Sequence, residues 1–161
     1  MDILCFGMQM ELDGKTFYEE NASKLEDANA ADILRFLADE EQKHHDYIKA
    51  FRDGSKELPP SRLVEDVRNV FQRMKDRNET FVTERSSMIS VLEKGLEMED
   101  RSIGFYQERA SASESADDRD VFLLLKRQED KHYALLSSMI EFYDRPHRWL
   151  EDAEFTHLDE Y

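Results

Sequence analysis

The sequence predicts an all-α protein, a four-helix bundle built from two similar helical hairpins. Three observations support this prediction: turn residues are scarce, apolar residues recur at helical spacing, and the chain repeats itself after 88 residues. Five glycines and three prolines among 161 residues leave few turns, so the elements should be long. Hydrophobic residues make up 40% of the chain, which is enough for a buried core although 37% of the residues are charged.

The four main helices are expected where apolar residues recur every three or four positions. These runs cover residues 3–26, 30–53, 84–112 and 117–143. Gly54 and the pair Pro59-Pro60 end the second run, because glycine favours the position after a helix and proline cannot continue one. An additional helix is expected at 61–80, with Ser61 as its N-cap.

These elements predict one domain and a short tail. The domain is a bundle over 1–145, with hairpins at about 3–53 and 84–143 and a crossover at 54–83. The tail, residues 146–161, has no clear element of its own and should fold back through its aromatic residues Trp149 and Phe155.

The internal repeat is the strongest feature of the sequence. Residues 3–23 and 91–111 agree at nine of 21 positions without a gap, whereas about one or two matches are expected by chance with ordinary composition. The same offset carries Glu41 and His44 onto Glu129 and His132. The chain is therefore interpreted as two hairpins of common design joined by a long crossover.

The repeat preserves four glutamates on apolar helix faces, where an unpaired carboxylate is costly. With a turn near residue 28, Glu11 lies 17 residues before the turn, and Glu41 and His44 lie 13 and 16 residues after it. At about 1.5 Å rise per residue, these three side chains reach a similar height in an antiparallel hairpin. In the second hairpin the same positions are held by Glu99, Glu129 and His132.

Two Glu-x-x-His pairs and two single glutamates facing inward form the ligand set of a carboxylate-bridged di-metal site. The predicted ligands are Glu11, Glu41, His44, Glu99, Glu129 and His132. Two divalent ions would balance the four carboxylates, and this donor set suits iron or manganese better than soft thiophilic metals. We expect two iron ions, for which manganese or zinc could substitute. The alternative is a bundle that kept the pattern but lost the metal.

The motifs Met10-Glu11 and Met98-Glu99, each followed by Phe-Tyr and later by Glu-x-x-His, resemble the rubrerythrin-like branch of the ferritin-like superfamily over roughly 1–145. The resemblance implies that Glu41 and Glu129 bridge two irons, that Glu11 and Glu99 are terminal ligands, and that each histidine serves one metal. Two departures stand out. Rubrerythrins carry a further Glu one turn after the third-helix ligand, where this chain has Ser102. They also carry a four-cysteine rubredoxin domain, which these 161 residues cannot form because Cys5 is their one cysteine.

Tyr18 and Tyr106 lie seven residues after Glu11 and Glu99, two turns along the same face. They are either core aromatics or residues that hydrogen-bond to a ligand carboxylate, orient it and shuttle a proton.

Three functions remain open. The first is a di-iron oxidoreductase that reduces peroxide or dioxygen with electrons from an external donor protein. The second is an iron-binding ferroxidase or storage protein, and the third is a non-catalytic metal-binding bundle. We expect a homodimer in the cytoplasm, because the N-terminus has no signal-peptide pattern and no apolar run approaches a membrane span. The net charge of −15 argues against binding nucleic acid or an anionic membrane.

Overall fold

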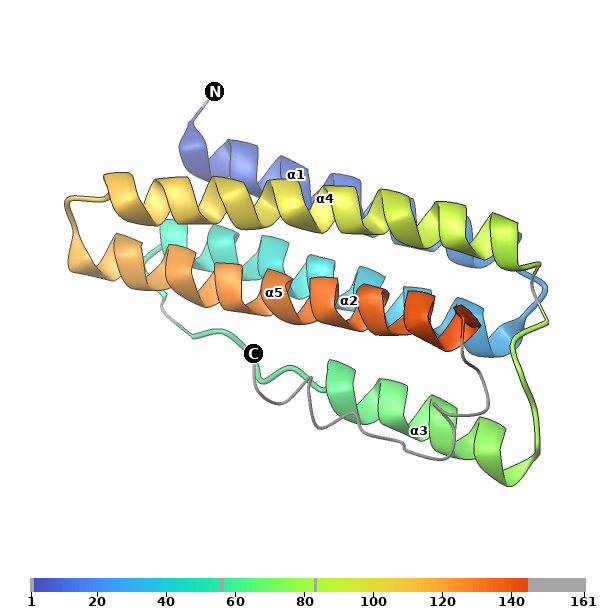
Figure 1. Cartoon of the computed structure of the whole chain (residues 1–161). Helices are drawn as coiled ribbons and strands as arrows, with labels where there is room; N and C mark the ends of the chain where they lie inside the picture. The colour runs from blue at the N-terminus through green and yellow to red at the C-terminus, as the bar shows by residue number, and fades with distance from the viewer. Residues whose placement is uncertain (1, 56, 83, 145–161) are drawn as a thin grey trace. The chain divides into compact units, whose positions relative to one another are not determined.

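The computed structural model describes residues 2–55, 57–82 and 84–144, and within these ranges it contains five helices and no strand. In chain order they are α1 (Ile3–Lys24), α2 (Ala28–Arg52), α3 (Leu63–Asp76), α4 (Arg85–Ala112) and α5 (Ala116–Asp144) (Figure 1). The chain divides into two compact units, Met1–Thr83 and Glu84–Tyr161. The predicted all-α fold, two homologous hairpins and a crossover with an extra helix, is confirmed.

In the first unit, α1 and α2 pack against each other as an antiparallel hairpin, and α3 packs against α2. The turn between α1 and α2 is short because both helix ends are capped. The amide of Leu25 donates to the carbonyl of Ala22 at the end of α1. The Asp27 carboxylate accepts from the amides of Asn29 and Ala30 at the start of α2, which satisfies two of the orphan N–H groups there.

The second unit, in which α4 packs against α5, repeats these caps at the same 88-residue offset. The amide of Ser113 donates to the carbonyl of Ala110 at the end of α4. The hydroxyl of Ser115 accepts from the amide of Asp118 at the start of α5. Ser115 occupies the repeat position of Asp27, so the two hairpins turn by the same device with different residues.

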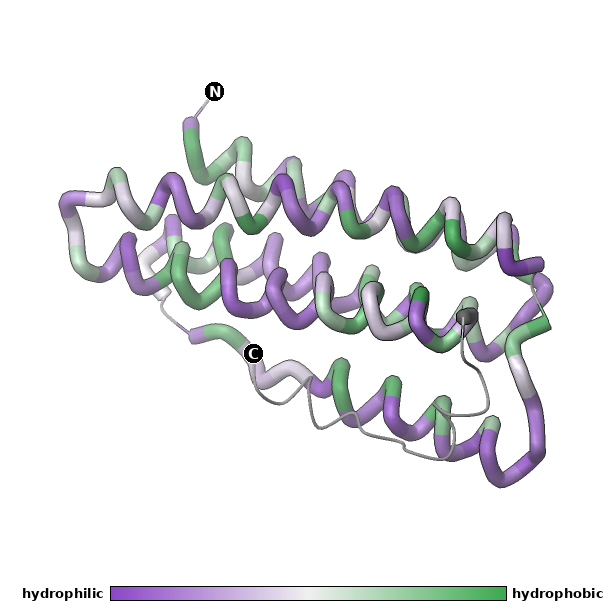
Figure 2. Tube along the Cα trace, in the orientation of Figure 1, coloured by the Kyte–Doolittle hydropathy of each residue, from purple (hydrophilic) through white to green (hydrophobic). Residues whose placement is uncertain are grey.

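Each helix alternates hydrophobic and hydrophilic residues along its length, as Figure 2 shows, which is the pattern of a helix with one buried face. The buried positions follow the repeat: Leu37 and Ile48 of α2 correspond to Leu125 and Leu136 of α5, and all four are almost completely inaccessible to solvent. Among the described residues, no helix is long and apolar enough to cross a membrane.

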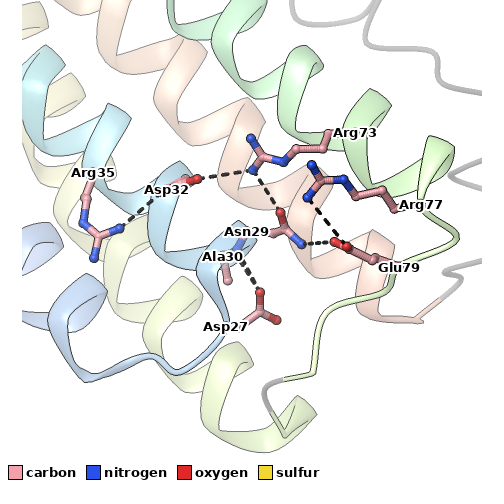
Figure 3. Close-up of polar contacts among 8 residues, drawn as sticks. All are labelled: Asp27, Asn29, Ala30, Asp32, Arg35, Arg73, Arg77 and Glu79. Atoms are coloured by element: carbon pink, nitrogen blue, oxygen red, sulfur yellow. Dashed lines mark hydrogen bonds and ion pairs between the residues drawn. The ribbon is translucent and has the colours of Figure 1, made fainter.

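A polar network ties the crossover to the start of α2 (Figure 3). The guanidinium of Arg73, near the end of α3, donates to Asn29 Oδ1 at 2.9 Å and to Asp32 Oδ2 at 3.2 Å. The Asn29 side-chain amide in turn donates to Glu79 Oε2 at 3.0 Å. α3 therefore rests on α2 by charge and hydrogen bonding as well as by its apolar face.

Asp27 completes this network, because its second carboxylate oxygen accepts from the backbone amide of Val82 at 2.6 Å. One buried side chain thus caps α2 and holds the last described residue before α4. We call the contacts made by Asp27, Asn29, Asp32, Arg73, Glu79 and Val82 the crossover clasp.

The extra helix is shorter than the predicted 61–80. It begins after Arg62, which is the N-cap and makes no side-chain cap bond, so the prediction of Ser61 as N-cap is wrong. Ser61 Oγ nevertheless accepts from the amide of Leu63 at 3.2 Å. α3 ends at Asp76, and Asn78 follows with a φ of 52°, a left-handed conformation that stops a helix. The predicted tail, 146–161, lies outside the described residues.

Candidate metal centre

In the first unit, the three predicted ligands converge between α1 and α2. Nδ1 of His44 lies 3.5 Å from Glu11 Oε2 and 3.6 Å from Glu41 Oε2. Glu41 and His44 are three residues apart on α2, so they share one helix face, and α1 brings Glu11 to the same height. All three side chains are buried.

The second unit contains the same arrangement between α4 and α5. Nδ1 of His132 lies 3.5 Å from Glu99 Oε1 and 3.6 Å from Glu129 Oε2. The six predicted ligands are only 1–3% exposed. The internal repeat of the sequence is therefore also a repeat of side-chain geometry around the two histidines.

Within each unit, a donor atom from each of the two carboxylates and from the imidazole lies within 4.8 Å of the others. We call these two groups the first cluster (Glu11, Glu41 and His44) and the second cluster (Glu99, Glu129 and His132). Oxygen donors with one imidazole fit a first-row divalent ion such as iron, manganese or zinc. Two carboxylates buried together repel each other unless a cation or proton compensates them, so each cluster is chemically suited to a metal.

The two clusters differ in what packs beside them. Gly14 of α1 faces Glu41, and a Cβ atom at Gly14 would lie 3.4 Å from the Cδ and Oε1 atoms of Glu41. The repeat position in α4 is Ser102, which is half-buried and carries a hydroxymethyl group where Gly14 has only hydrogen. The closest helix approach to a ligand carboxylate is thus built with glycine in the first unit.

The two predicted tyrosines are buried in equivalent places. Tyr18 meets Phe17 edge-on at 5.3 Å between ring centroids, and Tyr106 meets Phe105 in the same way at 5.3 Å. Tyr106 also stacks on Phe122 at 6.3 Å. Both tyrosines therefore belong to the core, and a hydrogen bond from either hydroxyl to a ligand carboxylate stays a prediction.

Sequence reasoning missed one buried carboxylate, Glu40, which precedes Glu41 on α2. Its side chain is as inaccessible as the predicted ligands, and its Oε1 lies 2.7 Å from Nζ of Lys43. The repeat gave no signal for Glu40, because Gln128 occupies its position in the second unit. The local signal was a second acidic residue one helical turn before His44.

Two further groups on α2 have shifted pKa values. Hydrogen bonding to His45 lowers the pKa of Asp46, whose Oδ1 lies 2.9 Å from Nδ1 of His45. Burial raises the pKa of Tyr47 above its usual value of 10.0, because the charged phenolate is poorly solvated there. His45, next to a predicted ligand, therefore faces Asp46 at the surface side of the helix, and no predicted ligand contact is assigned to it.

Comparison with known proteins identifies the family. No curated protein and no solved structure matches the chain. The family model described as Rubrerythrin matches residues 2–140, which include both hairpins, the crossover and all six predicted ligands. With the repeated carboxylate–histidine clusters in place, this match shows that the chain belongs to the rubrerythrin family.

Proposed function

We propose that the two clusters together hold a di-iron centre that reduces peroxide or dioxygen. The observation that supports this proposal is the equivalence of the clusters: each histidine lies 3.5 Å from one glutamate and 3.6 Å from the other. Glu41 and Glu129 would bridge the two ions, and Glu11 and Glu99 would each bind one. His44 and His132 would complete one ion each.

Charge supports two divalent ions. The ligand set carries four carboxylates, which together bring a charge of about −4 when ionised, and two divalent ions balance it. In the protein without metal, the same groups would compensate through protonation or through the neighbouring imidazoles.

Iron would supply the chemistry that the side chains lack, because two ferrous ions hold the two electrons that peroxide needs to become two waters. The protein's own part is to bind, to exclude water and to supply two protons. Burial of all six ligands keeps bulk water from the clusters. The hydroxyls of Tyr18 and Tyr106 are proposed to pass protons to the ligand carboxylates.

Repeated turnover would need an external electron-donor protein. A thiolate iron site that stores electrons needs several cysteines, and these 161 residues contain one, Cys5. We also propose a homodimer, which sedimentation of the metal-loaded protein would test.

A ferroxidase or iron-storage function is the second candidate, and Ser102 favours it. A hydroxyl is a poorer iron ligand than the carboxylate that rubrerythrins proper carry at this position. The iron pair would then have fewer ligands to exchange when its oxidation state changes.

The proposal is tested by loading the protein with ferrous iron without oxygen. About two ions per chain are expected, and a folded protein that takes up none would contradict the proposal. Stopped-flow mixing with peroxide and with dioxygen then separates the candidates. Faster oxidation by peroxide, sustained only with an added donor, supports the oxidoreductase, and much faster oxidation by dioxygen supports the ferroxidase.

Variants of single ligands test the roles assigned to them. Glu41→Ala and Glu129→Ala should lose both ions, since each carboxylate would serve two metals. Glu11→Ala should mainly weaken one ion. Equal losses in all three variants would contradict the division into bridging and terminal ligands.

A further inference from the structure

Glu40 is a buried carboxylate that the proposed ligand set does not use. It is 3% exposed, and the ammonium group of Lys43, one turn later on α2, lies 2.7 Å from its Oε1. A buried carboxylate is costly unless it is paired, so the Lys43 contact supports an ionised Glu40. The question is what a charged group does at this place.

Glu40 lies one helical turn before His44, at the spacing that brings side chains together on a helix. A carboxylate oxygen of Glu40 and a ring nitrogen of His44 lie within 4.8 Å of each other. Nδ1 of His44 faces the carboxylates of Glu11 and Glu41. Because the two nitrogens of an imidazole point away from each other, Nε2 is directed away from that carboxylate pair.

We propose that Glu40 is a positioning residue for the first cluster. Its carboxylate accepts a hydrogen bond from Nε2–H of His44, directly or through one water, and so presents Nδ1 as the metal-binding atom. A carboxylate behind a ligating histidine fixes the tautomer and makes the imidazole a stronger donor to the metal. The metal-binding part of this inference rests on the proposed function, whereas the contact between Glu40 and His44 does not.

The second cluster lacks this carboxylate, because Gln128 occupies the repeat position of Glu40. Gln128 is half-buried and neutral, so His132 is not backed by a charge from that position. The two halves of the centre therefore differ, and the ion bound by His44 should be held more tightly than the ion bound by His132.

The variant Glu40→Gln tests this difference, because it gives the first unit the residue found in the second. In Zn²⁺ titrations against a competing chelator, we expect the tighter of two binding steps to weaken about 10- to 100-fold. Glu19→Gln is the matched control. It removes the same charge from the same unit and breaks an exposed pair between Lys15 and Glu19, at 3.7 Å, and it should leave both steps unchanged.

A second measurement follows the hydrogen bond itself. In ¹⁵N-histidine NMR spectra, the Nε2–H proton of His44 should be visible and slow to exchange in the wild type, with and without Zn²⁺. It should exchange faster in Glu40→Gln and be lost in Glu40→Leu. If Glu40→Leu does not fold, the conservative Glu40→Gln variant still decides the matter.

The outcomes separate this inference from the proposed function. Two tightly bound Zn²⁺ ions in both wild type and Glu40→Gln, with an unchanged Nε2–H signal, would overturn the role of Glu40 and leave the metal centre standing. A wild type that binds no Zn²⁺ but shows a Glu40-dependent Nε2–H signal would overturn the metal centre and leave the contact standing. No metal and no Glu40-dependent signal would overturn both.

Discussion

At the scale of single residues, two helical glycines offer a matched test of the first cluster. Gly104 of α4 has open space where a Cβ atom would lie, whereas at Gly14 of α1 that atom would contact the Glu41 carboxyl group at 3.4 Å. Gly104→Ala should raise the free energy of unfolding by about 0.5–1 kcal/mol, because alanine restricts the unfolded chain and favours the helix. Metal affinity should not change.

Gly14→Ala should give a similar gain in the metal-free protein, since 3.4 Å is an ordinary van der Waals contact. The new methyl group would, however, fill the space into which the Glu41 carboxylate can turn, so metal affinity should fall. Urea denaturation without metal and Zn²⁺ titration measure the two effects. Unchanged affinity in Gly14→Ala would show that Glu41 needs no such freedom.

Tyr47 makes a prediction about alkaline pH. Its side chain is 3% exposed, and burial raises its pKa above 10.0. The folded protein holds the phenol neutral, so this contribution to stability is fully present below pH 10 and is lost as pH rises through the raised pKa. Tyr47→Phe should therefore lose less stability than wild type between pH 9 and 11, in urea denaturation at several pH values; about pH 10 is where an unfolded tyrosine ionises.

The control for this experiment is Tyr133→Phe, which changes an exposed tyrosine of α5. Its pH dependence should match that of the wild type. Parallel curves for wild type and Tyr47→Phe would mean that the buried phenol does not contribute to alkaline unfolding.

At the scale of elements, the crossover clasp predicts that the two equivalent caps are unequal in strength. Ser115 accepts one backbone amide at the start of α5, whereas Asp27 accepts two at the start of α2 and a third from Val82. Ser115→Ala should cost about 1 kcal/mol. Asp27→Ala should cost on the order of 2–4 kcal/mol, because it also removes a hydrogen bond to a charged acceptor.

Urea denaturation gives the two losses, and amide hydrogen exchange locates them. Exchange at Val82 should accelerate in Asp27→Ala well beyond the change in global stability, since the clasp is the bond that protects that amide. Equal losses in the two variants would show that the contact with Val82 adds nothing to the cap.

The same elements show what sequence reasoning reaches and what it misses. Helical periodicity and the repeat predicted the hairpins, because each helix buries one face and the same spacing serves both copies. The start of α3 was misplaced because Ser61 bonds to the amide of Leu63 one position before the true N-cap, Arg62. The bond from Val82 to Asp27 spans 55 residues, and no local pattern encodes such a contact.

For the candidate site, the repeat predicted which glutamates and histidines lie together within each hairpin, and the distances around His44 and His132 agree with it. Glu40 escaped because the repeat argument selects residues that both halves share. A group that makes the halves different is invisible to an argument from similarity. Its burial and its contact with Lys43 became evident only from the packing of α2.

At the scale of the whole molecule, the open question is whether the two clusters act as one centre or as two independent sites. The chain carries a formal charge of −15 and buries the four ligand carboxylates. Metal binding should therefore stabilise the fold, by about 2.7 kcal/mol when the free ion is at 100 times its dissociation constant. Both arrangements predict this gain, so global stability alone does not distinguish them.

Hydrogen exchange in the full-length Glu41→Ala variant does distinguish them. In the wild type, Zn²⁺ should slow amide exchange along α1 and α2 and equally along α4 and α5. If Glu41 bridges two ions in one centre, its removal abolishes the protection of α4 and α5 as well, although Glu99, Glu129 and His132 are all intact. If the clusters are independent, Glu41→Ala loses protection only in α1 and α2. Glu19→Gln, which changes an exposed charge on α1, should keep the wild-type protection in both hairpins. Because the bridging role couples groups on different hairpins, we expect the first result, and a loss confined to the first hairpin would reduce the di-iron proposal to two separate single-ion sites.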